Sequence, residues 1–222
     1  MPAPKKISRA RARRNLKKLL REPSVLEVNH GRLPDDAAER KAIPLCSGLL
    51  DYFPDALRDV EQNWARDPIV SNESDTIIWH LARRGLIDKA DGVRYSTKVA
   101  RLALAGLQKE IEEAEGRPAF NLPANPGLFD FVPDALAAIA HLSKIGNDQH
   151  NPGQPLHWAR GKSSDEADTI IRHLVDRGKI DKDGVRHSTK VAWRALANLQ
   201  KEIEADEGLP ISRGSWEPGR EQ

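Results

Sequence analysis

The chain has 222 residues, of which 39% are hydrophobic and 31% are charged, a balance typical of a soluble protein with one or two domains. The absence of any apolar run approaching ~18 residues argues against a membrane-spanning helix, and the charged N-terminus lacks the apolar segment of a secretory signal. Cys46 is the only cysteine. It excludes an internal disulfide and a thiolate-rich zinc site, and it favours a reducing cytoplasm.

The net charge of +2 is unevenly distributed. Residues 1–21 contain nine Lys or Arg and no acid, so the rest of the chain has a net charge of −7. The basic stretch Lys5–Arg21 fits two interpretations, an arm that binds nucleic-acid phosphates or a solvated extension. We therefore predict a basic N-terminal arm and linker over residues 1–42, followed by an acidic body that does not resemble a binder of phosphate backbones.

The body contains the same sequence pattern twice. The openings at 48–57 and 127–136 both lead from an apolar run into Pro-Asp and then helix formers, a good start for a helix because Pro at the first position loses no hydrogen bond and Asp favours the helix dipole. The two openings are 79 positions apart, whereas the later matching blocks are 92 or 93 apart, so the first copy is roughly 14 residues shorter. We assign its missing piece to a loop at 143–155 in the second copy.

Each copy predicts about three helices. In the second copy, Ser163 and Glu166 have the spacing of a capping box and predict a helix that starts near Ser164 and ends at Gly178. The Asp-Gly turn within 179–187 predicts a small hairpin or an irregular turn. Ser188 and Thr189 then predict the cap of a long last helix that stops at Gly208.

We therefore predict an all-α fold, a helical bundle built from two tandem related repeats packed as a pseudo-dimer. The predicted boundaries are a degenerate repeat at 43–118, an intact repeat at 119–210 and a C-terminal tail at 211–222 in which Trp216 docks back. Trp158, which follows the loop, is interpreted as a core anchor rather than a ligand-stacking residue. Assembly into a homo-oligomer is left open.

Matched positions in the two copies separate a common frame from a candidate site. The copies share the pairs Asp75/Asp168, His80/His173, Asp91/Asp183, Arg94/Arg186 and Lys98/Lys190. They differ at Asn63/His157, Trp79/Arg172, Tyr95/His187, Leu102/Arg194 and Gly106/Asn198, and only the second copy has the segment with His150. Either the second repeat holds one working site beside a structural first repeat, or it merely has a more solvated surface.

The polar groups of the second repeat match the needs of phosphate chemistry. Asp165 and Asp168 offer hard oxygen ligands for Mg²⁺ or Mn²⁺. The four histidines His150, His157, His173 and His187 offer imidazoles for proton transfer or for a softer metal. Arg172, Arg194 and Lys190 offer donors to phosphate oxygens. Structural readings compete: Asp165 could only favour a helix N-terminus, and His173 could be a satisfied core residue.

The order of these elements resembles the family of phage dATP/dGTP diphosphohydrolase N-terminal domains. The resemblance covers about 127–207, with a truncated echo at 48–115, and rests on six features. They are Pro133-Asp134-Ala135-Leu136, the loop at Gly146, Trp158-Ala159-Arg160-Gly161-Lys162, Asp168 with Arg172-His173-Leu174, Asp183-Gly184, and His187 leading into the last helix. It implies metal-dependent hydrolysis of purine deoxynucleoside triphosphates, with Asp168, Arg172, His173, Asp183 and His187 as the positions that matter.

We therefore expect a cytoplasmic, phage-associated nucleotide phosphohydrolase, located in the bacterial host if the chain is phage-encoded. His187, His173 and Asp183 are the expected catalytic residues, and Asp165 and Asp168 the expected ligands of Mg²⁺ or Mn²⁺. The expected substrate-binding residues are Arg172, Arg194, Lys190, Asn198, His150 and His157. The alternative is a protein without enzymatic activity, which binds nucleic acid through the basic arm or sequesters a nucleotide.

Overall fold

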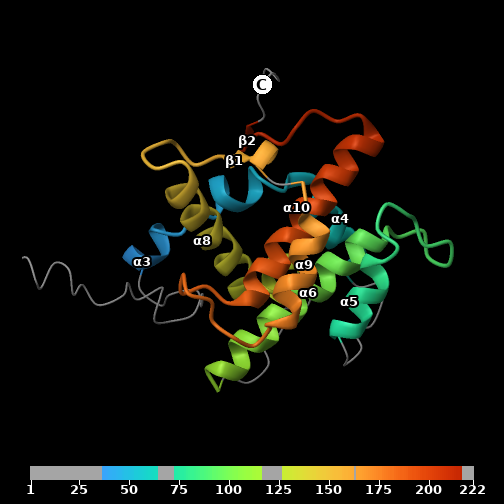
Figure 1. Ribbon diagram of the computed structural model, residues 1–222, viewed down its shortest axis with the longest axis horizontal. Coiled ribbons are helices and arrows are strands. Elements are labelled where there is room, and N and C mark those ends of the chain that lie inside the picture. Colours follow the sequence, from blue (N-terminus) through green and yellow to red (C-terminus); the bar gives the residue numbers. More distant parts are fainter. Residues whose placement is uncertain (1–36, 65–72, 117–126, 163, 217–222) are drawn as a thin grey trace, which may run out of the picture.

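The computed structural model describes residues 37–64, 73–116, 127–162 and 164–216, and the basic arm lies outside these ranges. The described part is mostly helical, as predicted, with one two-stranded parallel sheet (Figure 1). Its elements are α3 (Ala37–Lys41), the π-helical turn η1 (Cys46–Leu50), α4 (Pro54–Asn63), α5 (Glu73–Leu81), α6 (Tyr95–Ala114), α7 (Leu128–Phe131), α8 (Pro133–His150), β1 (Trp158–Ala159), the 3₁₀ turn η3 (Arg160–Lys162), α9 (Glu166–Val175), α10 (His187–Glu207) and β2 (Ser215–Trp216). Among the described residues, no helix has the length and apolarity needed to cross a membrane.

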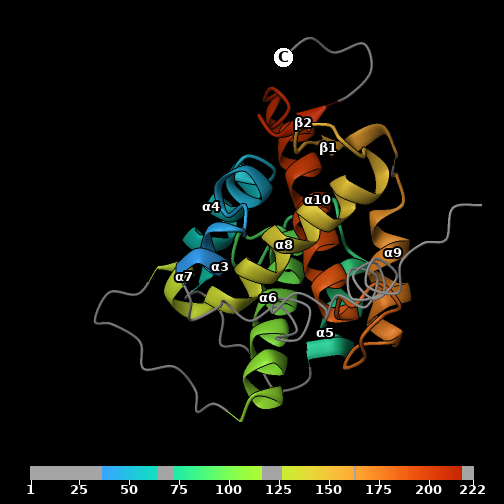
Figure 2. The same ribbon diagram turned by 90° about the vertical axis from the view of Figure 1, so that its left-hand side faces the viewer.

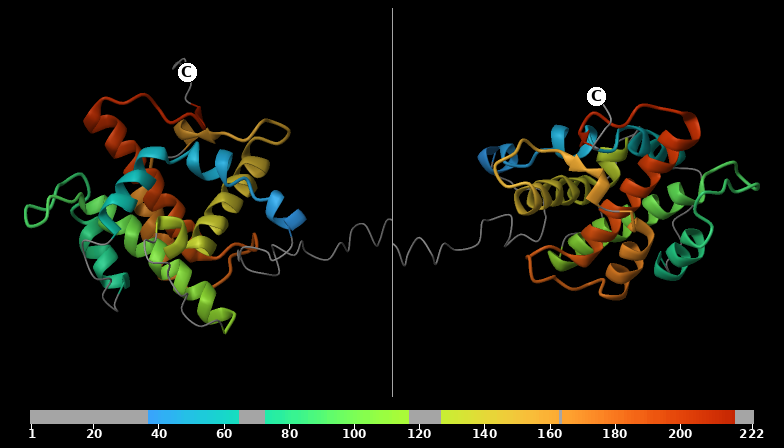
Figure 3. Two further views of the ribbon diagram at one scale, coloured as in Figure 1. Left: turned by 180° about the vertical axis from the view of Figure 1, so that it is seen from behind. Right: turned by 45° about the horizontal axis from the view of Figure 1, so that its top comes forward.

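The long helices α6 and α10 pack against each other and contact most of the other helices. Both helices bury an apolar stripe, with Leu104 and Leu107 on α6 and Leu196 and Leu199 on α10 fully buried. Figure 2 shows α4 and α9 on opposite sides of α10. The same arrangement seen from behind places α4 and η1 over the near face of this core (Figure 3). Helices α6 and α10 thus form the packed centre of the described structure.

Two glutamines make equivalent contacts between the halves. Gln200 on α10 accepts hydrogen bonds at its Oε1 from the backbone N–H groups of Asp55 and Ala56, at 2.9 and 3.0 Å. Gln108 on α6 accepts in the same way from the N–H groups of residues 134–135, at 3.0 and 3.1 Å. The first N–H groups of a helix have no partner within the helix. Each long helix therefore caps the opening helix of the other half.

Two serines make a second pair of contacts between the halves. Ser188 on α10 donates to the carboxylate of Glu110 on α6, and Ser96 on α6 donates to Glu202 on α10. The prediction that Ser188 caps α10 is wrong, because α10 begins at His187 and its N-cap residue, Arg186, makes no side-chain capping bond. The buried Ser188 hydroxyl satisfies the carboxylate of the neighbouring helix instead.

The predicted loop at 143–155 is wrong over its first half, since α8 continues to His150. Buried Ser143 and Asn147 face the core, and Lys144 forms an i,i+4 ion pair with Asp148 at 2.5 Å, so the amphipathic pattern carries through Gly146. The helix predicted to start near Ser164 begins at Glu166 with Asp165 as its N-cap residue, and no side-chain capping bond is formed. Ser163, the first residue of the expected capping box, lies outside the described residues.

The segment after α10 returns across the top of the molecule to pair β2 with β1 (Figure 1). The backbone N–H of Trp158 donates to the carbonyl of Gly214, and the N–H of Gly214 donates to the carbonyl of Asp51, both at 2.7 Å. A Cβ at position 214 would lie 2.6 Å from the ring of Tyr52, so this close approach requires glycine. The described part of the tail is therefore docked, and Trp216 lies beside His157 with ring centroids 6.2 Å apart.

Candidate functional site

A cavity of about 580 Å³ lies between the end of α8, the segment at 151–159, α9 and α10. Its volume is within the range of ~300–1,000 Å³ that small-molecule sites occupy. Six of the predicted site residues line it, although they come from five separate segments. They are His150, His157, His173, Asp183, Lys190 and Arg194.

One wall of the cavity is aromatic. Half-buried Trp193 on α10 donates from its indole Nε1 to the Ser143 hydroxyl at 2.9 Å, which fixes its ring against α8. Trp158 packs edge-on against Trp193 with centroids 5.6 Å apart and is only 5% exposed. The interpretation of Trp158 as a core anchor is confirmed. Tyr52, which comes from the first half of the chain, closes the wall and stacks on Trp158 at 6.3 Å.

Three cations also line the cavity, and the guanidinium of one of them, Arg194, lies 5.1 Å from the centroid of the Trp193 ring. Lys190 donates from its Nζ to Asp181 and Asp183, both at 2.6 Å. Arg194 is half-buried and lies 3.9 Å from the Glu166 carboxylate, and its partial burial lowers the pKa of its guanidinium. Lys162 is exposed and donates to the backbone carbonyl of residue 150 at 2.9 Å. The cavity therefore combines aromatic faces with positive charge.

His173 on α9 faces His187 at the start of α10, and their Nδ1 atoms are 2.9 Å apart. Burial lowers the pKa of His173, and the nearby charges of Lys190 and His187 lower it further. Both shifts favour the neutral imidazole. Asp181 lies beside this pair, and its pKa falls to about 2 because Lys190 and the backbone N–H of Lys182 hydrogen-bond to its carboxylate.

The other predicted residues lie away from the cavity lining. Arg172 and Asp165 are exposed and pair with each other at 2.7 Å on the surface of α9. Asp168 is exposed one turn away. Asn198 lies at the contact of α10 with α6, where its Nδ2 is 3.4 Å from the Ser96 hydroxyl. The predicted metal ligands Asp165 and Asp168 therefore do not share the cavity with the imidazoles, and their role stays a prediction.

Sequence reasoning missed three residues that build this region, Trp193, Lys162 and Asp181. Trp193 matches Arg101 in the first repeat, so a complete comparison of matched positions would have found it. Asp181 has a counterpart in Asp88 and therefore does not stand out as a difference between the copies. Its importance depends on the fold of the turn, which one antiparallel bridge between Ile180 and Arg186 closes.

The residues of the first half that match Arg172, His173 and His187 are three rings in mutual contact. Trp79, His80 and Tyr95 pack together with centroids 4.9 to 5.7 Å apart, and the guanidinium of Arg83 lies 3.8 Å above the Trp79 ring. The lysine bridge is kept, because Lys98 donates to Asp88 and Asp91 at 2.6 and 2.7 Å. The first half thus retains the charged frame, and aromatic rings stand where the second half has Arg172 and His187.

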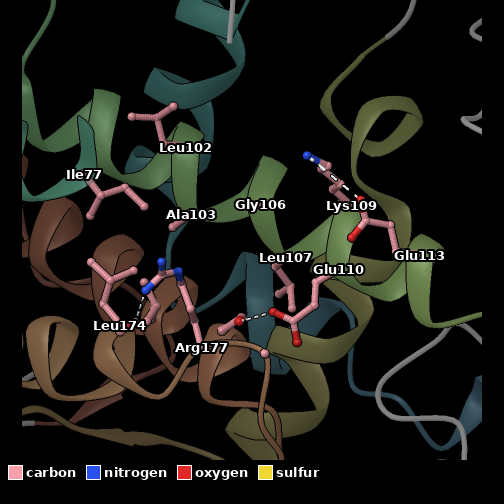
Figure 4. A pocket seen from close by; sticks show the side chains of 13 residues that line it. Ile77, Leu102, Ala103, Gly106, Leu107, Lys109, Glu110, Glu113, Leu174 and Arg177 are labelled. Atoms are coloured by element: carbon pink, nitrogen blue, oxygen red, sulfur yellow. Dashed lines mark hydrogen bonds and ion pairs between the residues drawn. The ribbon is translucent and has the colours of Figure 1, made fainter. Parts of the chain in front are cut away.

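A second cavity of about 520 Å³ lies between α5, α6, α9 and α10 (Figure 4). Gly106, Leu107 and Leu174 form part of its lining, and the Glu110 side chain points across it to Ser188. No residue predicted for the site lines it. Its existence follows from the small residue at position 106, since the counterpart in the other half is the larger Asn198.

No known family model, curated protein or solved structure matches this chain.

Proposed function

We propose that the cavity beside Trp193 binds a nucleotide and that the protein is a phage-associated phosphohydrolase of purine deoxynucleoside triphosphates. One observation carries the proposal, namely that aromatic faces, cations and imidazoles from distant segments line one cavity of about 580 Å³. A purine base needs an apolar face to stack on, and a polyphosphate needs Lys and Arg donors. Both requirements are met within a few residues of α10.

The positions of the cations assign the phosphate end of the proposed ligand. Lys190 and Arg194 lie one turn apart on α10, and Lys162 extends from η3 towards the end of α8. The Arg194 guanidinium lies 3.9 Å from the Glu166 carboxylate, which Lys201 holds at 2.7 Å. Because Arg194 lines the cavity, a phosphate group bound there would be a partner for its guanidinium. Trp193, on the same helix, would receive the base.

Proton transfer is assigned to the imidazoles. The neutral form of His173, which burial favours, is the form that accepts a proton from water. His187 holds His173 through the contact of their Nδ1 atoms and thereby sets its tautomer. Asp183 would act indirectly, because its carboxylate positions Lys190. Mg²⁺ or Mn²⁺, which the family resemblance implies, would neutralise phosphate charge, but no step is assigned to Asp165 or Asp168 because neither lines the cavity.

We also propose that the chain is a pseudo-dimer of two related repeats in which only the second carries a site. Two sets of matched contacts support this organisation, the glutamine caps at Gln108 and Gln200 and the serine–glutamate pairs at Ser96 and Ser188. Each contact joins one half to the other rather than closing within a half. A first half that only has to pack can replace Arg194 by leucine and His187 by tyrosine.

The proposal is tested with purified protein, a panel of deoxynucleoside and ribonucleoside triphosphates, and Mg²⁺ or Mn²⁺. Release of phosphate or pyrophosphate from dATP or dGTP, lost in Arg194→Leu and His173→Gln, is the expected result. Tight binding without cleavage would instead support nucleotide sequestration. Absence of both hydrolysis and binding by calorimetry would remove the nucleotide proposal. Lys109→Met, at the second cavity, is the matched control because Lys109 is an exposed cation outside the site.

A further inference from the structure

Three potential metal ligands converge at the edge of the nucleotide cavity. They are a nitrogen of His173 on α9, a carboxylate oxygen of Asp181 in the turn, and a nitrogen of His187 at the start of α10. All three atoms lie within 4.8 Å of one another. Ligand atoms around a tetrahedral zinc ion are roughly 3.4 Å apart, as bond lengths of about 2.0–2.2 Å require. Small side-chain movements would therefore bring the three atoms onto one ion.

We propose that His173, Asp181 and His187 bind a divalent transition-metal ion of the zinc class. Two imidazoles and one carboxylate form a set typical of catalytic zinc and of other borderline divalent ions, with coordination positions left open. Mg²⁺ prefers oxygen ligands and would select this set poorly. The proposed site is thus chemically distinct from the carboxylate site expected at Asp165 and Asp168.

The surrounding groups hold the three ligands in place. The turn that carries Asp181 is closed by the bond from the His187 backbone N–H to the carbonyl of Lys179, at 3.1 Å. Lys190 spans Asp181 and Asp183 at 2.6 Å each, so it orients the carboxylate. A carboxylate has about four lone-pair sites and can accept from Lys190 while it binds a metal.

The first half of the chain contains the same cluster with one ligand replaced. His80, Asp88 and Lys98 match His173, Asp181 and Lys190, but Tyr95 stands where the second half has His187. The Tyr95 ring packs on His80 with centroids 5.6 Å apart, whereas the His187 and His173 centroids are 5.1 Å apart. A purely structural histidine pair would explain the contact between the rings. It would not explain why the substitution removes the one group that completes a metal-ligand set.

Any role of this metal in hydrolysis rests on the proposed function, since His173 also lines the nucleotide cavity. There the ion would act as a Lewis acid close to bound phosphate, and His173 would be its ligand in place of a proton acceptor. Binding of the ion itself does not depend on the nucleotide. The two proposals can therefore fail separately, provided that metal binding is measured without nucleotide and nucleotide binding is measured with a chelator present.

The test uses the full chain after treatment with a chelator. Zn²⁺ affinity is measured by competition with a chromophoric chelator, and Co²⁺ is added as a spectroscopic probe. We expect one equivalent per chain and visible ligand-field absorption from Co²⁺. His187→Tyr, which copies the first half, and His173→Gln should each weaken Zn²⁺ binding about tenfold or more and remove the Co²⁺ absorption. Circular dichroism establishes that each variant is folded.

Two further variants sharpen the result. His141→Ala removes a half-buried histidine of α8 outside the cluster and should leave the stoichiometry unchanged. Tyr95→His restores the missing ligand in the first half and should add a second, weaker equivalent. The proposal is overturned if the parent protein binds no more equivalents of Zn²⁺ per chain than the His187→Tyr variant does. It is also overturned if the folded His173→Gln and His187→Tyr variants bind Zn²⁺ with the affinity of the parent protein.

Discussion

The two halves of this chain share a charged frame and differ in what the frame encloses. Each half has a lysine that spans two aspartates, Lys98 in the first and Lys190 in the second. Each also has a buried glutamine that caps the opposite half. Around the same lysine, the first half packs three aromatic or imidazole rings, whereas the second half leaves a cavity lined by cations and imidazoles. The difference shows that the same lysine–aspartate frame can support either packed rings or imidazoles beside a cavity.

The length of the opening helix contributes to this difference. Helix α4 has 10 residues and α8 has 18, and the added turns of α8 form one wall of the cavity. Ser143, at the start of these turns, accepts from Trp193 and donates to the carbonyl of Gly48 at 2.6 Å. A Cβ at position 48 would lie 3.0 Å from the carbonyl oxygen of Ala140, so the close contact of η1 with α8 depends on glycine. The extra segment is therefore integrated into the core.

The largest expected effect comes from the caps that the two halves share. Gln200→Ala and Gln108→Ala each leave buried backbone N–H groups without their acceptor, so each should lower the free energy of unfolding by about 3 kcal/mol. Chemical denaturation of the two variants measures both values. Similar losses would support an equivalent frame, and a loss near zero in only one variant would break the equivalence of the halves.

Substitution of the two bridging lysines distinguishes an effect on stability from an effect on nucleotide affinity. Lys98→Met and Lys190→Met should each cost about 2 kcal/mol of stability, because each removes the cation between two partly buried carboxylates. Only Lys190→Met should also weaken nucleotide affinity, by about tenfold, since only Lys190 lines the cavity. Calorimetry with a non-hydrolysable dATP analogue measures the affinity. An equal loss of affinity in Lys98→Met would mean that the effect is transmitted through the fold.

The substitution Arg194→Leu gives the cavity the residue type that the first half has at the matched position, Leu102. The free energy of unfolding should change by less than about 1 kcal/mol, because leucine avoids the cost of desolvating a half-buried cation. Nucleotide affinity should fall about tenfold or more with the loss of a charge-assisted contact. Thermal denaturation and calorimetry on the same samples separate these effects. Unchanged affinity would contradict the assignment of Arg194 to phosphate.

Local sequence signals were sufficient to predict where several helices begin and end. Pro54 and Pro133 begin helices as predicted, and Gly208 ends α10 with a positive φ angle of 64°. Helix α9, which was predicted to end at Gly178, ends at Val175.

Of the six predicted residues that line the cavity, His173, Asp183 and Lys190 are the same in both copies. The repeat comparison identified the other three, His150, His157 and Arg194, because the first copy had replaced or lost them. Such positions could be found because the chain contains its own reference.

The missed features depend on contacts across the halves. Gln108 and Gln200 are identical in both copies, so their role as caps is visible only when α6 and α10 are placed beside the opposite opening helices. Arg172 differs between the copies but points to Asp165 on the surface of α9, because its helical face turns away from the cavity. Sequence differences therefore identify changed chemistry, whereas the side on which a residue lies is decided by packing.

The smallest expected effect concerns two matched glutamates and depends on pH. Burial raises the pKa of Glu202, and its Oε1 is buried with no hydrogen-bond partner among the described residues. Its counterpart Glu110 instead accepts from the Arg186 guanidinium at 2.8 Å. A raised pKa means that the folded state holds the proton more tightly, so this stabilisation is present below the ordinary carboxyl pKa of 4.5 and is lost as the pH rises through the raised value.

The substitution Glu202→Gln removes the titrating carboxyl group and with it the loss of stability as the pH rises. The stability of this variant relative to the parent should therefore increase as the pH rises from 4.5 towards neutral. Glu110→Gln should have the opposite sign and lower stability at neutral pH by about 1 kcal/mol, because a partly buried ion pair with Arg186 is lost. Urea denaturation of both variants at a series of pH values measures the difference. Parallel pH profiles for the two variants would show that the glutamates are equivalent and that the asymmetry of the halves is confined to the cavity.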